Sequence, residues 1–581
     1  MKRRLVLMLF FVLASLQIVS AQRIRERIDY NWQFHLGECT DAVNPEFTPT
    51  EWEWTIVHLP HDWSIHLPFE VSAGGSSGYL PGGIGLYRKT IDIPQSYKGK
   101  RVSVVFDGIY HKATVYVNGK KVGYHRYGYT SFEYDITDYL EFGKTNVLFV
   151  HVDHAEESRW YTGSGIYRHV WLQVTDPIHV ATWGTYITTP DISEESADVN
   201  IVTSIVNSTN AEKQLKVIQT LIGKDGKALK VNGKKVSVEG NVIVAANDTT
   251  DYAQKFSILS PILWSIDNPH IYTVETTIKS GSRTLDKYTT DFGVRSFEFN
   301  NNTGFWLNGE NIKLKGVCLH QDAGSFGAAV PDRSYERRLQ ILKEFGANAI
   351  RCSHNPPSPE FLQMCDTLGF VVIDEAFDKW NSGYYAEFYH TSWRQDIKDM
   401  IIRDRNHPSI VLWSIGNEVQ EAFDNSVGPQ RAKIMQDFVH ELEPTRPVCL
   451  AGQQGFTDEF GSVTDVMGYN YLENRLIADH KRFPERVMLV TEAFPFYSGM
   501  RQNDVRDYVD YAPWNFVKDN DFIAGSFLWA GVDYIGEASA WPSKGWSSCP
   551  FDMCMFEKPE AAYLRSVWND EPFMRIMVRD N

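Results

Sequence analysis

The 581-residue chain has little cysteine and, beyond its first residues, no long hydrophobic run. Seven cysteines are too few for a disulfide-rich scaffold, and no CxxC pair or histidine cluster with zinc spacing is present. Cys549 and Cys554 could form a disulfide, but their spacing alone cannot show that they do. No later stretch approaches the ~20 apolar residues of a membrane-spanning helix. A disulfide scaffold, a structural zinc module and a membrane span are therefore not expected.

Basic residues are also in deficit, with 57 Lys and Arg against 73 Asp and Glu, for a net charge of −16. A nucleic-acid reader needs a basic surface to neutralise phosphates, so this balance argues against one. Aromatic residues make up 13% of the chain, which excludes a disordered protein because these side chains must be buried or covered. Aromatic richness in an acidic chain suits sugar stacking, and core packing explains most of these residues equally well.

The N-terminus has the pattern of a secretory signal peptide. Lys2, Arg3 and Arg4 precede an apolar run over residues 5–13, and the small residues Ser20 and Ala21 follow at the expected cleavage site. No cysteine for a bacterial lipid anchor follows Ala21. We therefore expect a signal peptide at 1–21 and export across the inner membrane into the periplasm.

Two β-sandwiches are predicted after the signal peptide. Residues 22–175 show short alternating runs, including 102–106 and 114–117, and the second run ends in the hairpin dipeptide Asn118-Gly119. Residues 176–299 continue the alternation in a smaller, more polar segment of immunoglobulin-like size. The first segment is predicted to be a jelly-roll-like sandwich and the second an immunoglobulin-like one.

The pattern changes after residue 300, where short apolar runs alternate with helical stretches. This order indicates βα units, and eight strands within about 280 residues predict a (β/α)₈ TIM barrel over 300–581. One helix is unusually clear: Ser358 as N-cap, Pro359 in the first turn and Gly369 as the stop. The predicted strands are 312–317, 347–351, 370–374, 410–413, 448–451, 466–469, 487–491 and 523–529.

Candidate site residues follow the predicted strands, because TIM-barrel active sites lie at the carboxyl ends of the strands. Two of them, Glu418 and Glu492, are carboxylates from opposite sides of one mouth, which is the arrangement that glycoside hydrolysis uses. A Glu after a buried strand is often only a solvated residue or an ion-pair partner. The polar and aromatic residues on the same rim favour a sugar site: His320, Arg351, His354, Asp374, Glu375, Asn417, Tyr471 and Trp529.

The whole mature chain resembles glycoside hydrolase family 2, which holds β-galactosidases, β-glucuronidases and β-mannosidases. The resemblance is carried by residues 82–89 (GGIGLYRK) and 164–168 (SGIYR) in the first sandwich. In the barrel it is carried by 348–354 (NAIRCSH), 404–409 (DRNHPS) and 413–418 (WSIGNE). These motifs are long and specific.

The resemblance implies a role for each matching residue in a retaining exo-β-glycosidase. Glu418 would be the acid/base and Glu492 the nucleophile. Asn417 would bind the sugar 2-hydroxyl, Tyr471 would donate to the nucleophile and Trp529 would form the floor of the sugar subsite. The remaining candidates, which would contact sugar hydroxyls or hold the carboxylates, are His320, Arg351 and His354.

Two departures from the family pattern bear on metals and specificity. Lys379 and Asn381 stand where metal-dependent relatives carry magnesium ligands, so we expect chemistry without a metal or other cofactor. Phe494 and Pro495 replace the histidine that reads a galactose 6-hydroxyl in those relatives. The region in which glucuronidases carry an Asn-x-Lys element holds Lys544 and Lys558 here, but no Asn-x-Lys triplet.

The expected substrate is an oligo- or polysaccharide with a terminal β-galactoside. A β-glucuronidase or β-mannosidase is the alternative within the family, and a carbohydrate-binding protein with an inactive barrel is the alternative outside enzymes. The oligomeric state is left open, homo-oligomers included.

Two further patterns are interpreted as non-catalytic. The sequence GGSSG at 74–78 matches a hydrolase G-x-S-x-G motif literally, but flanking prolines and glycines predict a loop that lines the barrel mouth. The basic residues Arg333, Arg337 and Arg338 are interpreted as the solvated face of a helix.

Overall fold

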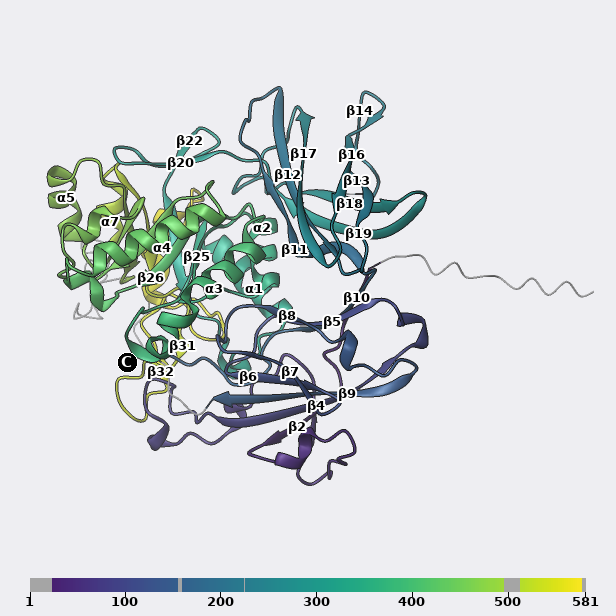
Figure 1. The fold of residues 1–581 in the computed structure, drawn as a ribbon. Coiled ribbons are helices and arrows are strands. Elements are labelled where there is room, and N and C mark those ends of the chain that lie inside the picture. The colour runs from purple at the N-terminus through teal and green to yellow at the C-terminus, as the bar shows by residue number, and fades with distance from the viewer. Residues whose placement is uncertain (1–22, 155–158, 224, 496–511, 577–581) are drawn as a thin grey trace, which may run out of the picture.

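The computed structural model describes residues 23–154, 159–223, 225–495 and 512–576. Within them the chain forms two β-sandwiches and a TIM barrel (Figure 1). The predicted signal peptide lies outside these residues. Among the described helices, none has the length and apolar character that crossing a bilayer requires.

The first sandwich consists of a four-stranded sheet, ordered β1-β10-β5-β8, and a six-stranded sheet, ordered β3-β2-β4-β9-β6-β7. Its core includes Trp32, Tyr87 and Val104, all nearly inaccessible to solvent. The strands are β1 (Ile24–Arg27), β2 (Trp32–Leu36), β3 (Thr55–Val57), β4 (Gly83–Ile93), β5 (Arg101–Phe106), β6 (Ala113–Val117), β7 (Lys120–His125), β8 (Phe132–Asp135), β9 (Lys144–His154) and β10 (Val170–Thr175).

The predicted hairpin at Asn118-Gly119 joins β6 to β7. Both turn residues have positive φ, 49° and 77°, as a two-residue type I′ turn requires. Asn118 also donates a side-chain hydrogen bond to the backbone carbonyl of Tyr139, which ties the turn to its neighbour. The turn prediction from the dipeptide is confirmed.

The second sandwich packs the sheet β11-β12-β17 against the sheet β16-β13-β18-β19. Alternate residues of β12 are buried along most of its length, which is the period-two pattern expected of a strand with one covered face. The strands are β11 (Ile178–Thr188), β12 (Ser196–Asn207), β13 (Lys213–Ile222), β14 (Lys230–Val231), β15 (Lys234–Lys235), β16 (Ser237–Val244), β17 (Asp248–Leu259), β18 (Tyr272–Ser280) and β19 (Arg283–Phe292).

Eight parallel strands close the barrel in sequence order, which confirms the predicted TIM fold. A small sheet, β20 (Phe297–Asn300), β21 (Gly304–Leu307) and β22 (Glu310–Ile312), precedes the barrel, and the pair β31 (Tyr534–Ile535) and β32 (Gly545–Trp546) follows it. The barrel strands are β23 (Leu314–Leu319), β24 (Ala349–Cys352), β25 (Val371–Glu375), β26 (Ile410–Asn417), β27 (Val448–Gly452), β28 (Val466–Asn470), β29 (Met488–Ala493) and β30 (Ile523–Leu528).

The helices surround the barrel. The helix predicted between Ser358 and Gly369 begins and ends next to those residues. Ser358 caps α2 by accepting a hydrogen bond from the backbone N–H of Phe361 at 3.3 Å, and Gly369 ends it with φ of 75°. The described helices are α1 (Asp332–Phe345), α2 (Pro359–Leu368), α3 (Ala386–Asp404), α4 (Gly428–Leu442), α5 (Glu473–Arg482), α7 (Trp514–Lys518) and α8 (Ala562–Trp568).

The interpretation of the basic cluster on α1 is wrong for Arg338. Arg333 and Arg337 are exposed, but Arg338 is buried and donates hydrogen bonds to the backbone carbonyls of Asp322 and His320. Position 338 faces the barrel, where a long cation is retained because carbonyl groups satisfy its donors.

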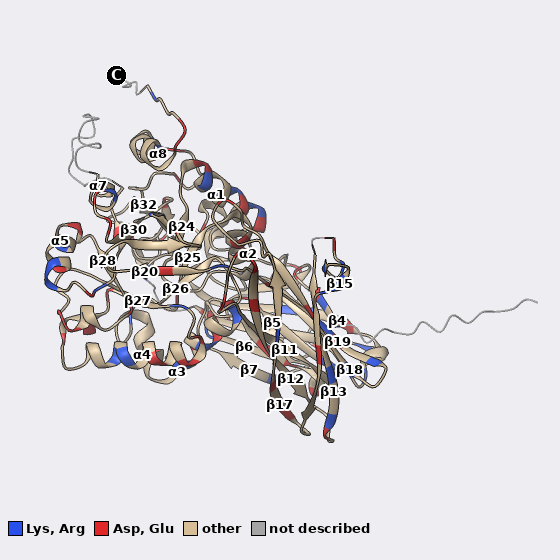
Figure 2. Cartoon of the chain, turned by 90° about the horizontal axis from the view of Figure 1, so that it is seen from above, with Lys and Arg blue, Asp and Glu red and all other residues tan. Residues whose placement is uncertain are grey.

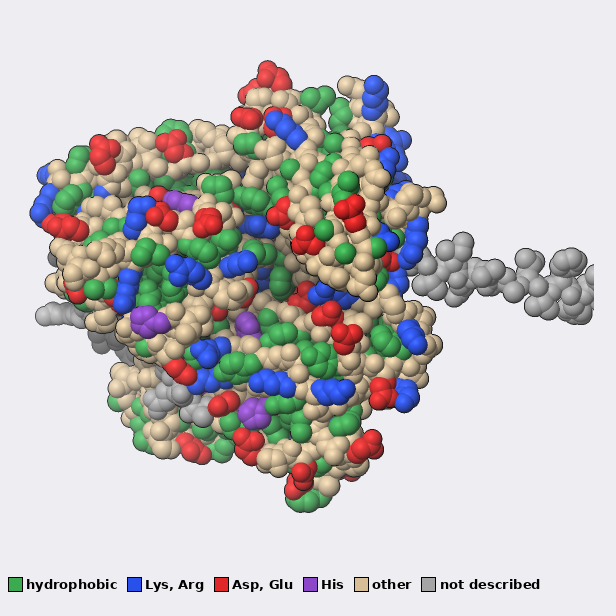
Figure 3. All heavy atoms as spheres, viewed as in Figure 1, with side chains coloured by type: hydrophobic (Ala, Val, Ile, Leu, Met, Phe, Trp, Pro, Cys, Tyr) green, Lys and Arg blue, Asp and Glu red, His purple; other side chains and the backbone are tan. Residues whose placement is uncertain are grey.

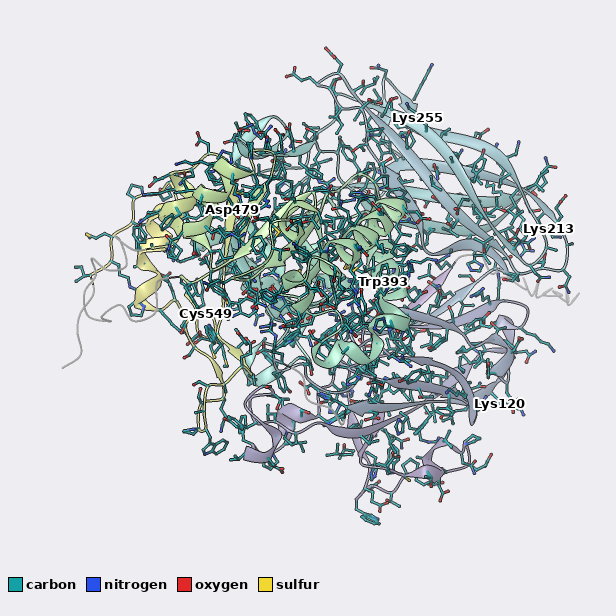
Figure 4. All side chains as sticks on the ribbon, turned by 60° about the vertical axis from the view of Figure 1, so that its left-hand side comes forward. Lys120, Lys213, Lys255, Trp393, Asp479 and Cys549 are labelled. Atoms are coloured by element: carbon teal, nitrogen blue, oxygen red, sulfur yellow. The ribbon has the colours of Figure 1, made fainter. Side chains whose placement is uncertain are left out.

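Charged side chains of both signs are interspersed over the outer surface. Blue and red segments alternate along the helices that ring the barrel (Figure 2), and the space-filling view shows the same mixture on the face it presents (Figure 3). Lys120 and Lys213 lie on the two sandwiches, remote from the barrel helix that carries Trp393 (Figure 4).

The first sandwich contributes loops to the barrel mouth. The predicted loop at 74–78 packs on the segment after β31: Gly75 accepts from Ala538 N–H at 3.0 Å and Ser76 accepts from Glu537 N–H at 3.1 Å. Trp160, between β9 and β10, forms a backbone bridge with Gly536. Two segments of the sandwich therefore meet the loop that follows β31.

Candidate active site

The eight residues to which the family resemblance assigns a role lie at the carboxyl ends of barrel strands. Glu418 follows β26, Glu492 is the last residue but one of β29, and the others lie at or just after the ends of β23, β24, β26, β28 and β30. Parallel strands that close a barrel bring their carboxyl ends to one rim, so residues up to 209 positions apart meet there.

Arg351 is the centre of this rim. Its guanidinium is inaccessible to solvent and donates to Glu375 Oε2 at 2.8 Å, to Glu492 Oε1 at 2.8 Å and to Asn417 Oδ1 at 3.1 Å. Charge-assisted hydrogen bonds from a planar guanidinium fix the positions of the carboxylates as well as balancing their charge. Arg351 therefore fixes the position of the predicted nucleophile, Glu492, relative to Asn417, the residue predicted to bind the sugar 2-hydroxyl.

Hydrogen bonds through Asn417 and Asn470 connect Arg351 to Glu418. Asn470 Nδ2 donates to Asn417 Oδ1 at 2.9 Å and to Glu418 Oε1 at 3.2 Å, so the acid/base candidate is oriented by the same amide that orients Asn417. The Asn417 amide nitrogen donates to Asp378 Oδ1 at 3.0 Å and lies 3.4 Å from His354 Nε2. The second contact is long, which leaves one donor available to a ligand hydroxyl.

Glu492 is almost fully buried, and burial raises its pKa to about 7. The positive charge of Arg351 opposes that effect, the negative charge of Glu418 adds to it, and a hydrogen bond from Tyr471 lowers the pKa. Because the charge of Glu418 raises the pKa of Glu492, the two carboxyl groups lie near enough to interact electrostatically. Their separation along the sequence is 74 residues.

Aromatic rings form one wall of the site. Trp529 stacks on His354 with ring centroids 5.1 Å apart and an interplanar angle of 9°, and its Nε1 donates to Tyr534 Oη at 3.1 Å. His320 meets Trp529 edge-on at 5.2 Å. Burial lowers the pKa of His320 to about 3 and that of His354 well below its usual value, so both rings are neutral.

Of the two acids predicted after the third strand, only Glu375 joins the site. It pairs with Arg351, accepts from Ser414 Oγ at 2.7 Å and contacts His354 Nδ1 at 2.5 Å. Asp374 instead interacts with Asp404 and Arg403 at the end of α3. Successive strand residues point to opposite faces, so Asp374 faces the helices and not the mouth.

Four functional candidates were not predicted. Asn470 is the last residue of β28, so its position at the carboxyl end of a strand is the sequence signal that could identify it. Asp378 lies in the loop after β25, where its spacing carried no signal. Arg159 and Glu537 come from the first sandwich and from the loop after β31, and they meet at 2.6 Å. Only the folded chain brings these last two together.

The residues near Glu418 do not fit a magnesium ion. Lys379 Nζ lies 3.8 Å from Glu418 Oε2 and donates to the Asn417 carbonyl at 3.0 Å, whereas magnesium requires oxygen ligands. A separate group whose ligand atoms lie within 4.8 Å of one another, His169, Asp332 and Glu360, lies between the first sandwich and α1 and α2. His169 there pairs with Asp29 and Asp332, at 2.7 and 3.1 Å.

Comparison with known proteins identifies the family. The model described as "Glycosyl hydrolases family 2, sugar binding domain" matches residues 19–177, "Glycosyl hydrolases family 2" matches 178–295, and "Glycosyl hydrolases family 2, TIM barrel domain" matches 298–488. A β-galactosidase of Bacteroides ovatus is 37% identical over 95% of this chain and 73% of its own length. The chain belongs to glycoside hydrolase family 2. It is therefore a glycoside hydrolase, and its substrate is a carbohydrate.

Other members of the family that match this chain have different names. A putative β-glucuronidase of Formosa agariphila is 32% identical over 96% of this chain and 57% of its own length. A solved family 2 structure from Bacteroides cellulosilyticus superposes with a TM-score of 0.85 at 35% identity, covering 94% of this chain and 71% of the other. A Bacteroides uniformis β-glucuronidase 2, solved with cyclophellitol-6-carboxylate aziridine bound covalently, gives 0.83 at 27% identity, covering 95% and 70%.

Proposed function

We propose that the chain is a retaining exo-β-glycosidase that removes terminal non-reducing β-D-galactosides, with Glu418 as acid/base and Glu492 as nucleophile. In the first step Glu492 attacks the anomeric carbon while Glu418 gives its proton to the leaving oxygen. In the second step Glu418 takes a proton from water, and the water displaces Glu492 from the sugar. The pairing of Glu492 with Arg351 and Tyr471 supports its role, because both contacts favour the ionised nucleophile.

The proposal of a neutral sugar, a galactoside, in place of a glucuronide rests on the ion pairs that arginine and lysine side chains form with carboxylates in the mouth. Arg351 binds Glu375 and Glu492, Arg159 binds Asp378 and Glu537, and Lys379 lies against Asp378 and Glu418. To bind one of these three cations, a glucuronide carboxylate would have to break a pair that the described residues form. A galactoside needs only hydroxyl contacts, which the carboxylates and amides of the mouth supply.

The two lysines that the sequence left as glucuronate candidates have other contacts. Lys544 Nζ lies over the ring of Trp541, 3.2 Å from its centroid, and also faces Phe69 and Tyr79. Lys558 pairs with Asp533 at 2.6 Å and donates to the Ser547 carbonyl. Cation–π and ion-pair contacts of this kind engage both charges. The name of the Bacteroides ovatus relative agrees with the galactoside proposal.

The test is a parallel assay of 4-nitrophenyl β-D-galactoside, β-D-glucuronide and β-D-mannoside with purified enzyme. The galactoside should have the largest kcat/KM, and the Glu492→Gln variant prepared identically is the control for contaminating activity. A larger kcat/KM for the glucuronide or mannoside would reject galactose specificity. Binding of sugars without turnover of any glycoside would favour an inactive carbohydrate-binding barrel.

Stereochemistry tests the mechanism separately from specificity. Proton NMR of the early reaction mixture should show the β-anomer of the released sugar before mutarotation, because two inversions restore the configuration. The α-anomer appearing first would indicate one displacement by water and would reject Glu492 as the nucleophile.

A further inference from the structure

We propose that Arg159 of the first sandwich is a positioning residue that fixes Asn417 and Trp529 in the barrel mouth. The proposal rests on the roles assigned to those two residues under the proposed function. Arg159 lies between β9 and β10, and its side chain crosses into the barrel to bind two carboxylates there, Asp378 and Glu537. Each carboxylate leads to a different part of the sugar site.

The first branch runs from Arg159 to Asn417. Arg159 Nε donates to Asp378 Oδ2 at 2.9 Å, and Asp378 Oδ1 accepts from Asn417 Nδ2 at 3.0 Å. The Asp378 backbone carbonyl also accepts from Asn417 N–H at 2.6 Å. Asp378 thereby fixes both the backbone and the amide of the residue expected to bind the sugar 2-hydroxyl.

Asp378 depends on its cations because its side chain is only 2% exposed. Burial alone would raise its pKa, but Arg159 and Lys379 lower it below the usual value, so the group is a carboxylate. Removing one partner of a buried ion pair leaves an uncompensated charge, which the structure relieves by moving the side chain or admitting water. Either response would disturb the Asn417 amide.

The second branch runs from Arg159 to the aromatic floor. Arg159 Nη1 donates to Glu537 Oε1 at 2.6 Å, and Tyr534 donates its hydroxyl to the other Glu537 oxygen. The Tyr534 oxygen in turn accepts from Trp529 Nε1 at 3.1 Å. The orientation of the Trp529 ring is therefore fixed by this series of hydrogen bonds at Nε1 and by stacking on His354 at the ring face.

Arginine is suited to this position because its planar guanidinium donates in two directions at once, whereas a lysine ammonium is a single point charge. The backbone bridge between Trp160 and Gly536 brings the two loops together beside it. Arg27 offers a matched comparison: it comes from the same sandwich, is 38% exposed against 37% for Arg159, and pairs with Asp332 of α1 outside the mouth.

The experiment compares Arg159→Gln with wild type on two substrates: the 4-nitrophenyl glycoside that the panel favours and its 2-deoxy analogue. Loss of the Asn417 branch should affect a substrate that has a 2-hydroxyl more than one that lacks it, whereas loss of the floor branch should affect both equally. We expect kcat/KM to fall roughly 100-fold on the parent glycoside and at least roughly fivefold less on the 2-deoxy analogue. Arg159→Lys should recover part of the loss.

Two variants serve as controls. Glu537→Gln removes charge from the floor branch alone, so it should lower both rates by the same factor. Arg27→Gln should leave both rates and their ratio at wild-type values, with thermal unfolding reporting any effect on the domain contact.

An unchanged ratio between the two substrates in Arg159→Gln would overturn the proposal, whether or not overall activity falls. A ratio that changes equally in Glu537→Gln would overturn the assignment of separate branches. The parent sugar is the one that the parallel glycoside assay favours, so the Arg159 test remains valid even if the galactose assignment is wrong. The proposed mechanism is tested separately, because an active Glu492→Gln variant would reject it.

Discussion

Arg351 Nη1 donates a 2.8 Å hydrogen bond to Glu492 Oε1 at a site where the guanidinium has no contact with solvent. The same guanidinium is held by Glu375, so its position is set before any substrate arrives. A nucleophile fixed in this way keeps its orientation without reorganisation during attack. The burial that provides this rigidity also raises the pKa of Glu492, which gives the site its pH dependence.

Replacing Glu492 with Gln should abolish turnover while preserving the fold. The amide has nearly the same shape but cannot form the covalent intermediate, so kcat should fall at least roughly 10³-fold. Single-turnover and steady-state assays measure the loss, and circular dichroism checks the fold. Turnover within tenfold of wild type would exclude Glu492 as the nucleophile.

The rate should fall on the acid side of pH 7. Glu492 attacks only when ionised, and its pKa is raised to about 7, so the active fraction decreases as the pH drops through that value. We expect kcat/KM to fall about tenfold per pH unit below pH 6. Tyr471→Phe removes a hydrogen bond that lowers this pKa and should move the acid limb to higher pH. A limb that stays in place or moves to lower pH would contradict the assignment.

Replacing Glu418 with Ala should have an effect that depends on the leaving group. A good leaving group such as 2,4-dinitrophenolate needs little protonation, so glycosylation should slow far less for it than for a methyl or sugar leaving group. Pre-steady-state measurement of the first step across a leaving-group series gives the slope. Equal losses across the series would argue against an acid role for Glu418.

Stability should depend on His169 at the contact between the first sandwich and α1. Burial alone would lower its pKa, but hydrogen bonds to Asp29 and Asp332 raise it to about 10. A raised folded pKa gives stabilisation that is complete below about pH 6.5 and is lost as the pH rises towards 10. His169→Gln should therefore cost about 2–4 kcal/mol at pH 6 and less at pH 10.

Denaturant unfolding at several pH values measures this dependence. The control is His440→Gln, which removes a more exposed histidine that contacts Asp465 at 2.8 Å and should cost less than about 1 kcal/mol. A His169→Gln penalty that is the same at pH 6 and pH 10 would show that the imidazole is not charged in the folded protein.

The eight barrel strands were predictable because each is a short apolar run buried on both faces. The run 410–413 marks β26 correctly, although the strand continues to Asn417, since polar residues at the mouth interrupt the apolar pattern before the strand ends. The prediction of an exposed side chain is wrong for Arg338. Helix periodicity does not show that backbone carbonyl groups from another segment accept hydrogen bonds from this buried guanidinium.

The family motifs and the strand-end positions led to Glu418, Glu492 and Asn417, and the fold brings them to one rim. They did not lead to Asp378 or Arg159, because no regular spacing joins a loop of the first sandwich to a loop of the barrel. The partners of Arg159 lie 219 and 378 residues away along the chain.

The sequence by itself determined the order of the elements, two sandwiches and then a barrel, because hydrophobic periodicity and turn residues act over a few neighbouring positions. It also determined which side chains stand at the strand ends. Only the tertiary structure decided which of those face the mouth, as Glu375 does and Asp374 does not, and how the mouth's charges pair. Charge pairing depends on distance and burial in space, and these quantities exist only once distant segments have packed together.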